Sequence, residues 1–155
     1  LKWPNDLYLA ERKLGGILIE IAGDVGGECL VIVGVGINVS MPAEVGRVID
    51  QPWVDLAGQG VVVRRGRLAG VVSSAVGLAL SEFESSGLPG VRAAWERFDL
   101  LKGREVIVST GQESWHGVAR GIDEAGRLLV ETHTRQVALS AGEVSVRSAF
   151  RDTAD

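Results

Sequence analysis

Residues 1–20 read LKWPNDLYLAERKLGGILIE, a polar opening that becomes an apolar run at a glycine pair. The run from Gly16 to Ile21 predicts a strand, and the β-branched run from Cys29 to Val35 predicts a second one. The sequence therefore predicts a β-hairpin that carries the polar opening at its start. Glycines, which favour turns, lie between the two runs at Gly23, Gly26 and Gly27.

The chain beyond the hairpin changes character twice. Residues 41–66, with two prolines and several glycines, are predicted to be irregular. From Arg67 to Phe83 apolar residues recur at intervals of three and four, which predicts an amphipathic helix. The Gly-Leu-Pro break at 87–89 is predicted to start a shorter helix that includes Trp95 and Phe98.

A third change follows Lys102-Gly103, where five short β-type runs are separated by turns. Such a group within about 45 residues predicts a small SH3-like β-barrel. We place the domain boundary near Leu101–Gly103, which divides the chain into residues 1–101, residues 102–150 and a tail at 151–155. The predicted strands are Glu105–Ser109, Ser114–Ile122, Leu128–Thr132, Gln136–Leu139 and Val144–Arg147.

Composition and charge narrow the classes of function. With 155 residues and 46% apolar content, the chain can bury a sizeable core. The net charge of −4 offers no basic field for a nucleic-acid backbone, so we expect no nucleic-acid binding by this segment. No apolar run approaches the ~18 residues of a membrane span, and the single Cys29 excludes an internal disulfide. We therefore expect a cytoplasmic protein without membrane contact. Because residue 1 is Leu and the first motif begins at once, we also expect a piece of a longer protein.

The opening segment concentrates charge on a stiff backbone. Pro4 fixes its own φ and restricts the residue before it, while Lys2 and Asn5-Asp6 supply a cation, an amide and a carboxylate. Lys13 then precedes Gly15-Gly16, where a ligand can approach the backbone closely. Two lysines near one pocket suit a carboxylate or phosphate ligand. The alternative is an ordinary turn beside a solvated strand end.

A second polar element, Gly34-Val35-Gly36-Ile37-Asn38, ends the second predicted strand. Its glycine spacing is similar to a dinucleotide-binding fingerprint, but Val39 stands where the third glycine belongs and no helical period follows, which excludes that motif. What remains is a strand end where Asn38, both donor and acceptor, can read a purine edge. The alternative is a structural glycine pair with a turn asparagine.

Trp53 in the irregular segment has two interpretations. It can stack on a flat ligand within a loop that excludes water, or it can fill the core. The histidines His116 and His133 have no partner acid or nucleophile at a suggestive spacing, so we assign them no chemistry. Arg64–Arg67 has the composition of a phosphate clamp, but it directly precedes the predicted helix and is more simply interpreted as a solvated helix start.

Three segments in order resemble the catalytic core of biotin protein ligases: Lys2-Trp3-Pro4-Asn5-Asp6, Arg12-Lys13-Leu14-Gly15-Gly16-Ile17-Leu18-Ile19-Glu20 and Gly34-Val35-Gly36-Ile37-Asn38. The resemblance implies an α+β fold: a class II synthetase-like catalytic domain lacking its N-terminal part, with a partial mixed or antiparallel sheet and helices, followed by the SH3-like barrel. Further matches to the family in order and spacing are Trp53, Trp95-Glu96-Arg97, Gly117–Gly126 and Gly142–Ser148.

The resemblance also implies an ATP-dependent ligase that forms biotinyl-5′-AMP and transfers biotin to one lysine of a biotin carboxyl carrier domain. Lys13 would neutralise the acyl-phosphate junction, with Lys2 and Asp6 completing the implied catalytic set and Asp6 helping the incoming carrier lysine. Mg²⁺ is implied by the ATP chemistry, although no carboxylate cluster in the sequence identifies its ligands. The implied biotin-binding residues are Lys13, Gly15, Gly16 and Ile17, and the implied ATP- or adenylate-binding residues are Lys2, Asn5, Asn38, Trp53 and Arg147.

One feature of the family does not occur in this sequence. Family members carry a Gly/Arg-rich loop that wraps biotin upstream of the first motif, and this chain begins after that point, so we expect the chain alone to be an impaired ligase. The incomplete sheet would leave an unpaired edge, for which aggregation or a homodimer is the expected response. Two alternatives stay open: a related lipoate-attaching ligase, and a non-catalytic binding or dimerisation module.

Overall fold

The computed structural model describes residues 1–23, 29–111, 113–142 and 145–148. These residues form an α+β chain with two antiparallel sheets, which confirms the predicted fold class. The chain groups into two compact units: an N-terminal unit of Asn5–Ala79, and a C-terminal unit that joins Leu1–Pro4 to Leu80–Asp155. The units divide inside a helix, and the domain boundary near 101–103 stays a prediction.

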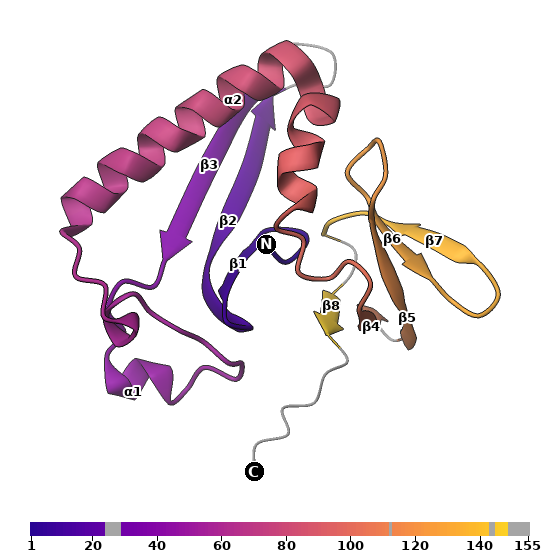
Figure 1. Cartoon of the computed structure of the whole chain (residues 1–155), viewed down its shortest axis with the longest axis horizontal. Coiled ribbons are helices and arrows are strands. Elements are labelled where there is room, and N and C mark those ends of the chain that lie inside the picture. The colour runs from indigo at the N-terminus through magenta and orange to yellow at the C-terminus, as the bar shows by residue number, and fades with distance from the viewer. Residues whose placement is uncertain (24–28, 112, 143–144, 149–155) are drawn as a thin grey trace. The chain divides into compact units, whose positions relative to one another are not determined.

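The sheet of the N-terminal unit has three strands in the order β1-β2-β3 (Figure 1). They are β1 (Asp6–Leu9), β2 (Arg12–Gly23) and β3 (Cys29–Ile37). The β2–β3 pair confirms the predicted hairpin, although both strands extend beyond their predicted ends. The sequence does not predict β1, because four residues give no usable period. The predicted turn residues Gly26 and Gly27 lie outside the described residues.

The segment after β3 is less irregular than predicted. It contains the short helix α1 (Ala43–Gly46) and a 3-10 turn, η1 (Ala57–Gln59). Between them the chain returns to the start of β2. There the backbone N–H of Lys13 donates to the carbonyl of Pro52, and the carbonyl of Lys13 accepts from the backbone N–H of Val54, each at 2.9 Å. The segment after α1 therefore lies beside the residue that the sequence singles out for catalysis.

Helix α2 (Arg65–Glu96) begins two residues before its predicted start and continues past the predicted break. Gly87 adopts φ 61° and ψ −167°, which interrupts the helix, and Pro89 is tolerated because it stands in the first turn of the next segment. The two predicted helices are therefore confirmed as two segments of one element. Phe98, predicted to lie in the second, follows its end.

The sheet of the C-terminal unit has five strands in the order β7-β6-β5-β4-β8. All five correspond to predicted strands, and the architecture is consistent with the predicted SH3-like barrel. Residue 144, predicted as the first of the last strand, lies outside the described residues. The strands are β4 (Glu105–Thr110), β5 (Glu113–Ile122), β6 (Leu128–Glu131), β7 (Gln136–Leu139) and β8 (Ser145–Ser148).

A continuous apolar core fills the C-terminal unit. Alternate residues of its strands point inward, as the period of two requires, and Trp3 joins them from the start of the chain. The Trp3 indole N–H also donates to the carbonyl of Gly126 at 3.1 Å, which satisfies its polar end. The buried members are Trp3, Leu101, Val106, Val108, Ala119, Ile122, Leu128, Val130, Leu139 and Val146.

The N-terminal unit leaves most of its apolar strand residues in contact with solvent. Adjacent residues of a strand point to opposite faces of the sheet. Because adjacent residues such as Leu18 and Ile19 are both exposed, both faces of the β2–β3 ribbon are in contact with solvent. Between 45% and 72% of the surface is exposed for Leu18, Ile19, Ile21, Leu30, Val31 and Ile32.

Candidate functional site

A bulge in β2 decides where Lys13 points. Asp6 pairs with Gly16 across the β1–β2 ladder. Two residues further along β1, Tyr8 pairs with Lys13, which leaves Leu14 as an extra residue on β2. Directly paired residues share a face, and so do residues two apart on one strand. The extra residue therefore turns Lys13 onto the face of Asp6.

Lys13 and Asp6 form an ion pair on that face. The Lys13 Nζ lies 2.7 Å from the Asp6 Oδ1, and the two side chains are 29% and 26% exposed. An ion pair this open to water stabilises a fold by no more than about 1 kcal/mol. An incoming anion can therefore replace Asp6 beside the ammonium group at little cost.

A cavity of about 530 Å³ opens beside this ion pair, and we call it the strand-face cavity. Gly16 pairs with Gly36 across β2 and β3, so neither strand places a side chain at that point. A ligand can therefore approach the main chain of both strands closely. The cavity is lined by Asp6, Lys13, Gly16, Ile17, Leu18, Gly34, Val35 and Gly36.

A second cavity, of about 370 Å³, is walled in part by residues 41–53, and we call it the loop cavity. Gly15 is required at its base, because a Cβ there would lie 2.1 Å from the carbonyl oxygen of Gly36. The strands contribute Lys13, Gly15, Gly16, Gly36, Ile37 and Asn38 to the lining, and the 41–53 loop contributes Met41, Ile49, Gln51 and Trp53.

The two cavities share Lys13, Gly16 and Gly36. Of these three residues only Lys13 is charged. A ligand with two halves joined by an anionic group can thus occupy both cavities while its junction lies against the Lys13 ammonium. The arrangement brings together the predicted residues Asp6, Lys13, Gly15, Gly16, Ile17, Asn38 and Trp53.

Asn38 joins three segments of the main chain. Its backbone N–H donates to the carbonyl of Leu14 at 2.8 Å. Its side-chain amide donates to the carbonyls of Lys13, at 3.3 Å, and Val54, at 3.1 Å. The amide nitrogen therefore holds β2, the end of β3 and the 52–54 segment together, and recognition of a purine edge by Asn38 stays a prediction.

Trp53 is half-buried, and its predicted stacking on a flat ligand stays a prediction. The indole N–H donates to the carbonyl of Gly46 at 3.1 Å, which ties Trp53 to the end of α1. A Cβ on Gly46 would lie 2.3 Å from the Trp53 Cζ2, so the ring packs flush against that backbone. Trp53 thus fixes the 41–53 loop while it lines the loop cavity.

Three other predicted residues are placed differently. Lys2 and Arg147 belong to the C-terminal unit, where Lys2 is half-buried and Arg147 is exposed on β8, opposite Ile107 of β4. Asn5 contributes its carbonyl, which accepts a 2.8 Å hydrogen bond from the amide of Ile17. The ATP-binding roles of these three residues stay predictions.

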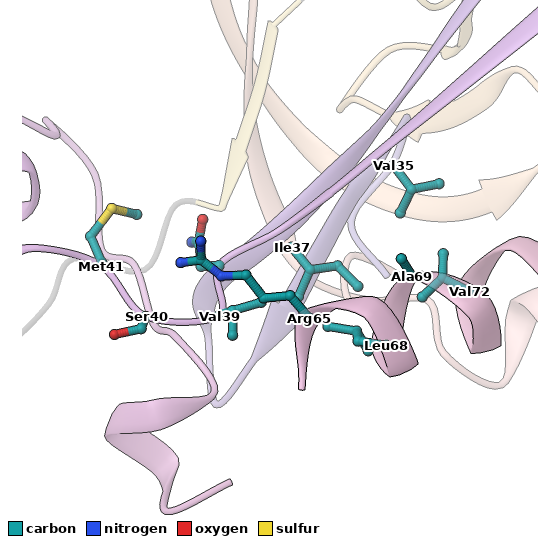
Figure 2. Close-up of a pocket in the computed structure, with 10 residues that line it drawn as sticks. Val35, Ile37, Val39, Ser40, Met41, Arg65, Leu68, Ala69 and Val72 are labelled. Atoms are coloured by element: carbon teal, nitrogen blue, oxygen red, sulfur yellow. The ribbon is translucent and has the colours of Figure 1, made fainter. Parts of the chain in front are cut away.

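A third cavity, of about 400 Å³, lies between the end of β3 and the start of α2, and we call it the helix-face cavity (Figure 2). Arg65, in the exposed arginine-rich helix start, is the one charged residue among the described residues that line it. The remaining walls are mainly aliphatic, as in a strand–helix packing contact, so we assign this cavity no ligand. Its aliphatic lining includes Val35, Ile37, Val39, Leu68, Ala69 and Val72.

Asp55, two residues after Trp53, is buried although it lines none of the three cavities, and the sequence does not reveal it. Hydrogen bonds from the amides of Met41 and Gly58 lower the pKa of its carboxyl group, and outweigh the opposing effect of burial. A lone aspartate after Trp53-Val54 carries no spacing signal. Only its position before a Gly-containing turn hints at a capping role.

The described ranges contain no group of three or more His, Cys, Asp or Glu side chains that could hold a metal ion. In the same ranges, no helix combines the length and the apolar character that a membrane span requires.

Two family models match the chain. The one described as "Biotin/lipoate A/B protein ligase family" matches residues 1–38, and "Biotin protein ligase C terminal domain" matches residues 102–147. The bifunctional ligase/repressor BirA of Escherichia coli (strain K12) is 38% identical over 149 residues. The chain belongs to the biotin protein ligase family.

Other relatives support the same assignment. The biotin--[acetyl-CoA-carboxylase] ligase of Paracoccus denitrificans is 30% identical over 147 residues. The apo structure of biotin protein ligase from Aquifex aeolicus matches with a TM-score of 0.80 at 29% identity, covering 96% of this chain and 65% of that one. The same Aquifex protein in complex with biotin and ATP matches with a TM-score of 0.78 at 28% identity, covering 96% of this chain and 62% of that one.

This biotin protein ligase family member spans about half the length of the curated relatives it matches. The E. coli match covers 96% of this chain and 46% of the relative, and the Paracoccus match covers 93% and 61%.

Proposed function

We propose that this protein is an ATP-dependent biotin protein ligase, which forms biotinyl-5′-AMP and passes the biotinyl group to a lysine of a biotin carboxyl carrier domain. The observation that carries the proposal is the meeting of two cavities at Lys13, the one charged residue that they share. A similar Aquifex aeolicus protein has been solved with biotin and ATP, which supports the choice of ligands.

In the first step, a biotin carboxylate oxygen attacks the α-phosphorus of ATP. The bond from that phosphorus to the bridging oxygen breaks, and pyrophosphate leaves. Because two anionic groups must approach each other, a fixed cation at their meeting point lowers the barrier. We assign that role to Lys13, with the biotin head against Gly15, Gly16 and Ile17.

We assign the adenosine of ATP to the loop cavity. Its lining combines the half-buried ring of Trp53, which can cover a flat base, with the polar groups of Asn38. Lys2, Asn5 and Arg147 are assigned to the ATP phosphates on the resemblance to the family alone.

In the second step, the neutral amine of the carrier lysine attacks the acyl carbon of biotinyl-5′-AMP. The bond from that carbon to the phosphate oxygen breaks, AMP leaves with the electron pair, and the amine loses a proton. Lys13 again stabilises the charge on the departing phosphate. Once Lys13 turns to the ligand, the Asp6 carboxylate is released from the ion pair and can accept that proton.

Mg²⁺ fits this site as an ion that arrives with ATP. The ion would keep phosphate and water ligands and take one or two carboxylates. Asp6, which lines the strand-face cavity, is the residue that would hold it. When bound, Mg²⁺ supplies charge neutralisation at the phosphates. We place the reaction in the cytoplasm, and a homodimer is the assembly that we expect from an unpaired edge of the sheet.

The test is a ligation assay with the full-length protein, biotin, ATP, Mg²⁺ and a carrier domain. We expect pyrophosphate release that depends on biotin, followed by one biotinyl group per carrier. Preference for lipoate over biotin would indicate the lipoate-attaching class instead. Binding of biotinyl-5′-AMP without transfer to the carrier would indicate a binding module.

A further inference from the structure

Asp55 is a charged side chain in a position that usually holds an apolar one. It is 8% exposed, and the preceding Val54 is 3% exposed. Burial of a carboxylate is costly unless its oxygens accept hydrogen bonds. The groups that donate hydrogen bonds to Asp55 therefore indicate the role of its carboxylate.

Both oxygens of the Asp55 carboxylate accept a backbone N–H at 2.7 Å. Oδ1 accepts from Gly58, three residues further along the chain and within η1. Oδ2 accepts from Met41, fourteen residues earlier. A turn cap needs the first bond alone. The second bond reaches across the unit to the start of the 41–53 loop.

The space around Asp55 is built for this double contact. A Cβ on Gly58 would lie 2.8 Å from the Asp55 Oδ1, so a side chain at that position would displace the carboxylate. The neighbouring main chain is paired as well, because the amides of Leu56 and Ala57 donate to the carbonyls of Asn38 and Val39, each at 3.0 Å. The segment after Asp55 is thus docked along the residues that lead to Met41.

Met41 contributes to the lining of two cavities. It lines the loop cavity, and it also lines the helix-face cavity, where Figure 2 shows its side chain. Trp53, two residues before Asp55, lines the loop cavity as well. Asp55 therefore connects two residues that line the loop cavity. Its Oδ2 holds the backbone of Met41, and the main chain links it to Trp53 two residues earlier.

We propose that Asp55 is a positioning residue for nucleotide binding, which acts by fixing Met41 and so the width of the loop cavity. The proposal rests on the proposed function, which assigns the nucleotide to that cavity. Asp55 touches no reacting atom, so its loss affects ATP more than biotin, whose cavity does not include Met41.

The test compares Asp55→Ser with Asp123→Ser in the full-length protein. The serine hydroxyl can still cap the Gly58 amide but cannot also reach Met41. Asp123 is the matched control, because it too accepts two backbone N–H groups, from Ala125 and Arg127 at 2.9 Å, but lies in the C-terminal unit.

For Asp55→Ser we expect KM for ATP to rise about tenfold, the equivalent of one hydrogen bond to a charged group. KM for biotin and kcat should change by less than about twofold, and Asp123→Ser should leave all three parameters unchanged. An unchanged KM for ATP, or an equal rise for ATP and biotin, would overturn the proposal.

Two further measurements keep the result interpretable. If Asp55→Ser fails to fold, Asp55→Asn, which keeps the side-chain shape and one acceptor oxygen, replaces it with the same expectation. The dissociation constant for ATP is measured by equilibrium dialysis in parallel. If the wild-type protein formed no adenylate, the proposed function would fail, while the ratio of ATP dissociation constants between variant and wild type would still decide the role of Asp55.

Discussion

The two units of this protein differ in what their apolar residues do. In the C-terminal unit, ten of the described residues form one buried cluster, and Leu101, Val106, Val108 and Leu128 are fully inaccessible. In the N-terminal unit, Val54 is the buried large apolar residue among those described, and the β2–β3 ribbon is exposed on both faces.

The difference shows that stability and chemistry are concentrated in different places. The C-terminal unit buries the apolar side chains of its strands in its own core, as a small β-domain must to be stable. The N-terminal unit instead has glycines where side chains would pack, two cavities that meet at a lysine, and a carboxylate where a core residue is expected. An open apolar ribbon of this size is the kind of surface that proteins cover with another element.

The largest effect that we expect comes from Lys13→Ala in the full-length protein. Adenylate formation, followed as biotin-dependent pyrophosphate release, should fall at least about 10²–10³-fold, because the forming mixed anhydride loses its cation. The unfolding midpoint should hardly move, since the ion pair with Asp6 is partly exposed to water. Lys102→Ala, which removes a comparable lysine paired with Glu96 in the C-terminal unit, should leave activity unchanged.

A matched pair of leucines tests the contrast in packing. In the 155-residue chain, Leu128→Ala should lower the free energy of unfolding by about 2–5 kcal/mol, because it opens a cavity in a closed core. Leu30→Ala, in β3, should change it by less than about 0.5 kcal/mol, because Leu30 is 63% exposed. Denaturant titration measures both values. Equal losses of unfolding free energy in the two variants would mean that the face of the ribbon around Leu30 is buried in solution. The difference in packing between the two units would then not hold.

The acid stability of the N-terminal unit should depend on Asp55. Its pKa is lowered from an ordinary value of 3.8, chiefly by the hydrogen bond from Met41, so the ionised form stabilises the fold above that pH. The contribution is lost as the pH falls below 3.8 towards the folded-state pKa. The difference in unfolding free energy between wild type and Asp55→Asn should therefore be constant near neutral pH and shrink in acid. A difference that did not change with pH would contradict this role of the charge.

The smallest effect should come from the β1–β2 turn. Ala10 adopts φ 46°, in the left-handed region, so Ala10→Gly should stabilise the chain by up to about 1 kcal/mol. Ala22→Gly, within the extended part of β2, should destabilise it by about 0.5–1 kcal/mol. Thermal unfolding gives the sign of both changes, and a loss of stability on Ala10→Gly would show that the turn is not strained.

The two units also differ in how far the sequence predicts them. The five strands of the C-terminal unit are predicted from the alternation of apolar and polar residues. In β4, for example, Val106 and Val108 are buried and lie two residues apart. The hairpin of the N-terminal unit is predicted by its apolar runs. The place of Lys13 before a glycine pair suits an anionic ligand but is equally typical of a solvated strand end, so the role of Lys13 comes from the resemblance to the family and stays a prediction.

What the sequence does not predict depends on register and on distant contacts. The bulge at Leu14 depends on the register in which Tyr8 pairs with Lys13, and no pattern of residues along either strand predicts that register. The bond from Met41 to Asp55 joins residues fourteen apart, and the amide of Asn38 serves two carbonyls that only the fold brings together. These are the features that shape the loop cavity.

The most direct test of the central claim is a crystal structure of the full-length protein with biotinyl-5′-AMP. We expect the acyl-phosphate junction within hydrogen-bond distance of the Lys13 Nζ, the biotin head in the strand-face cavity and the adenine beside Trp53 in the loop cavity. Intermediate bound elsewhere, with Lys13 still paired to Asp6, would contradict the account.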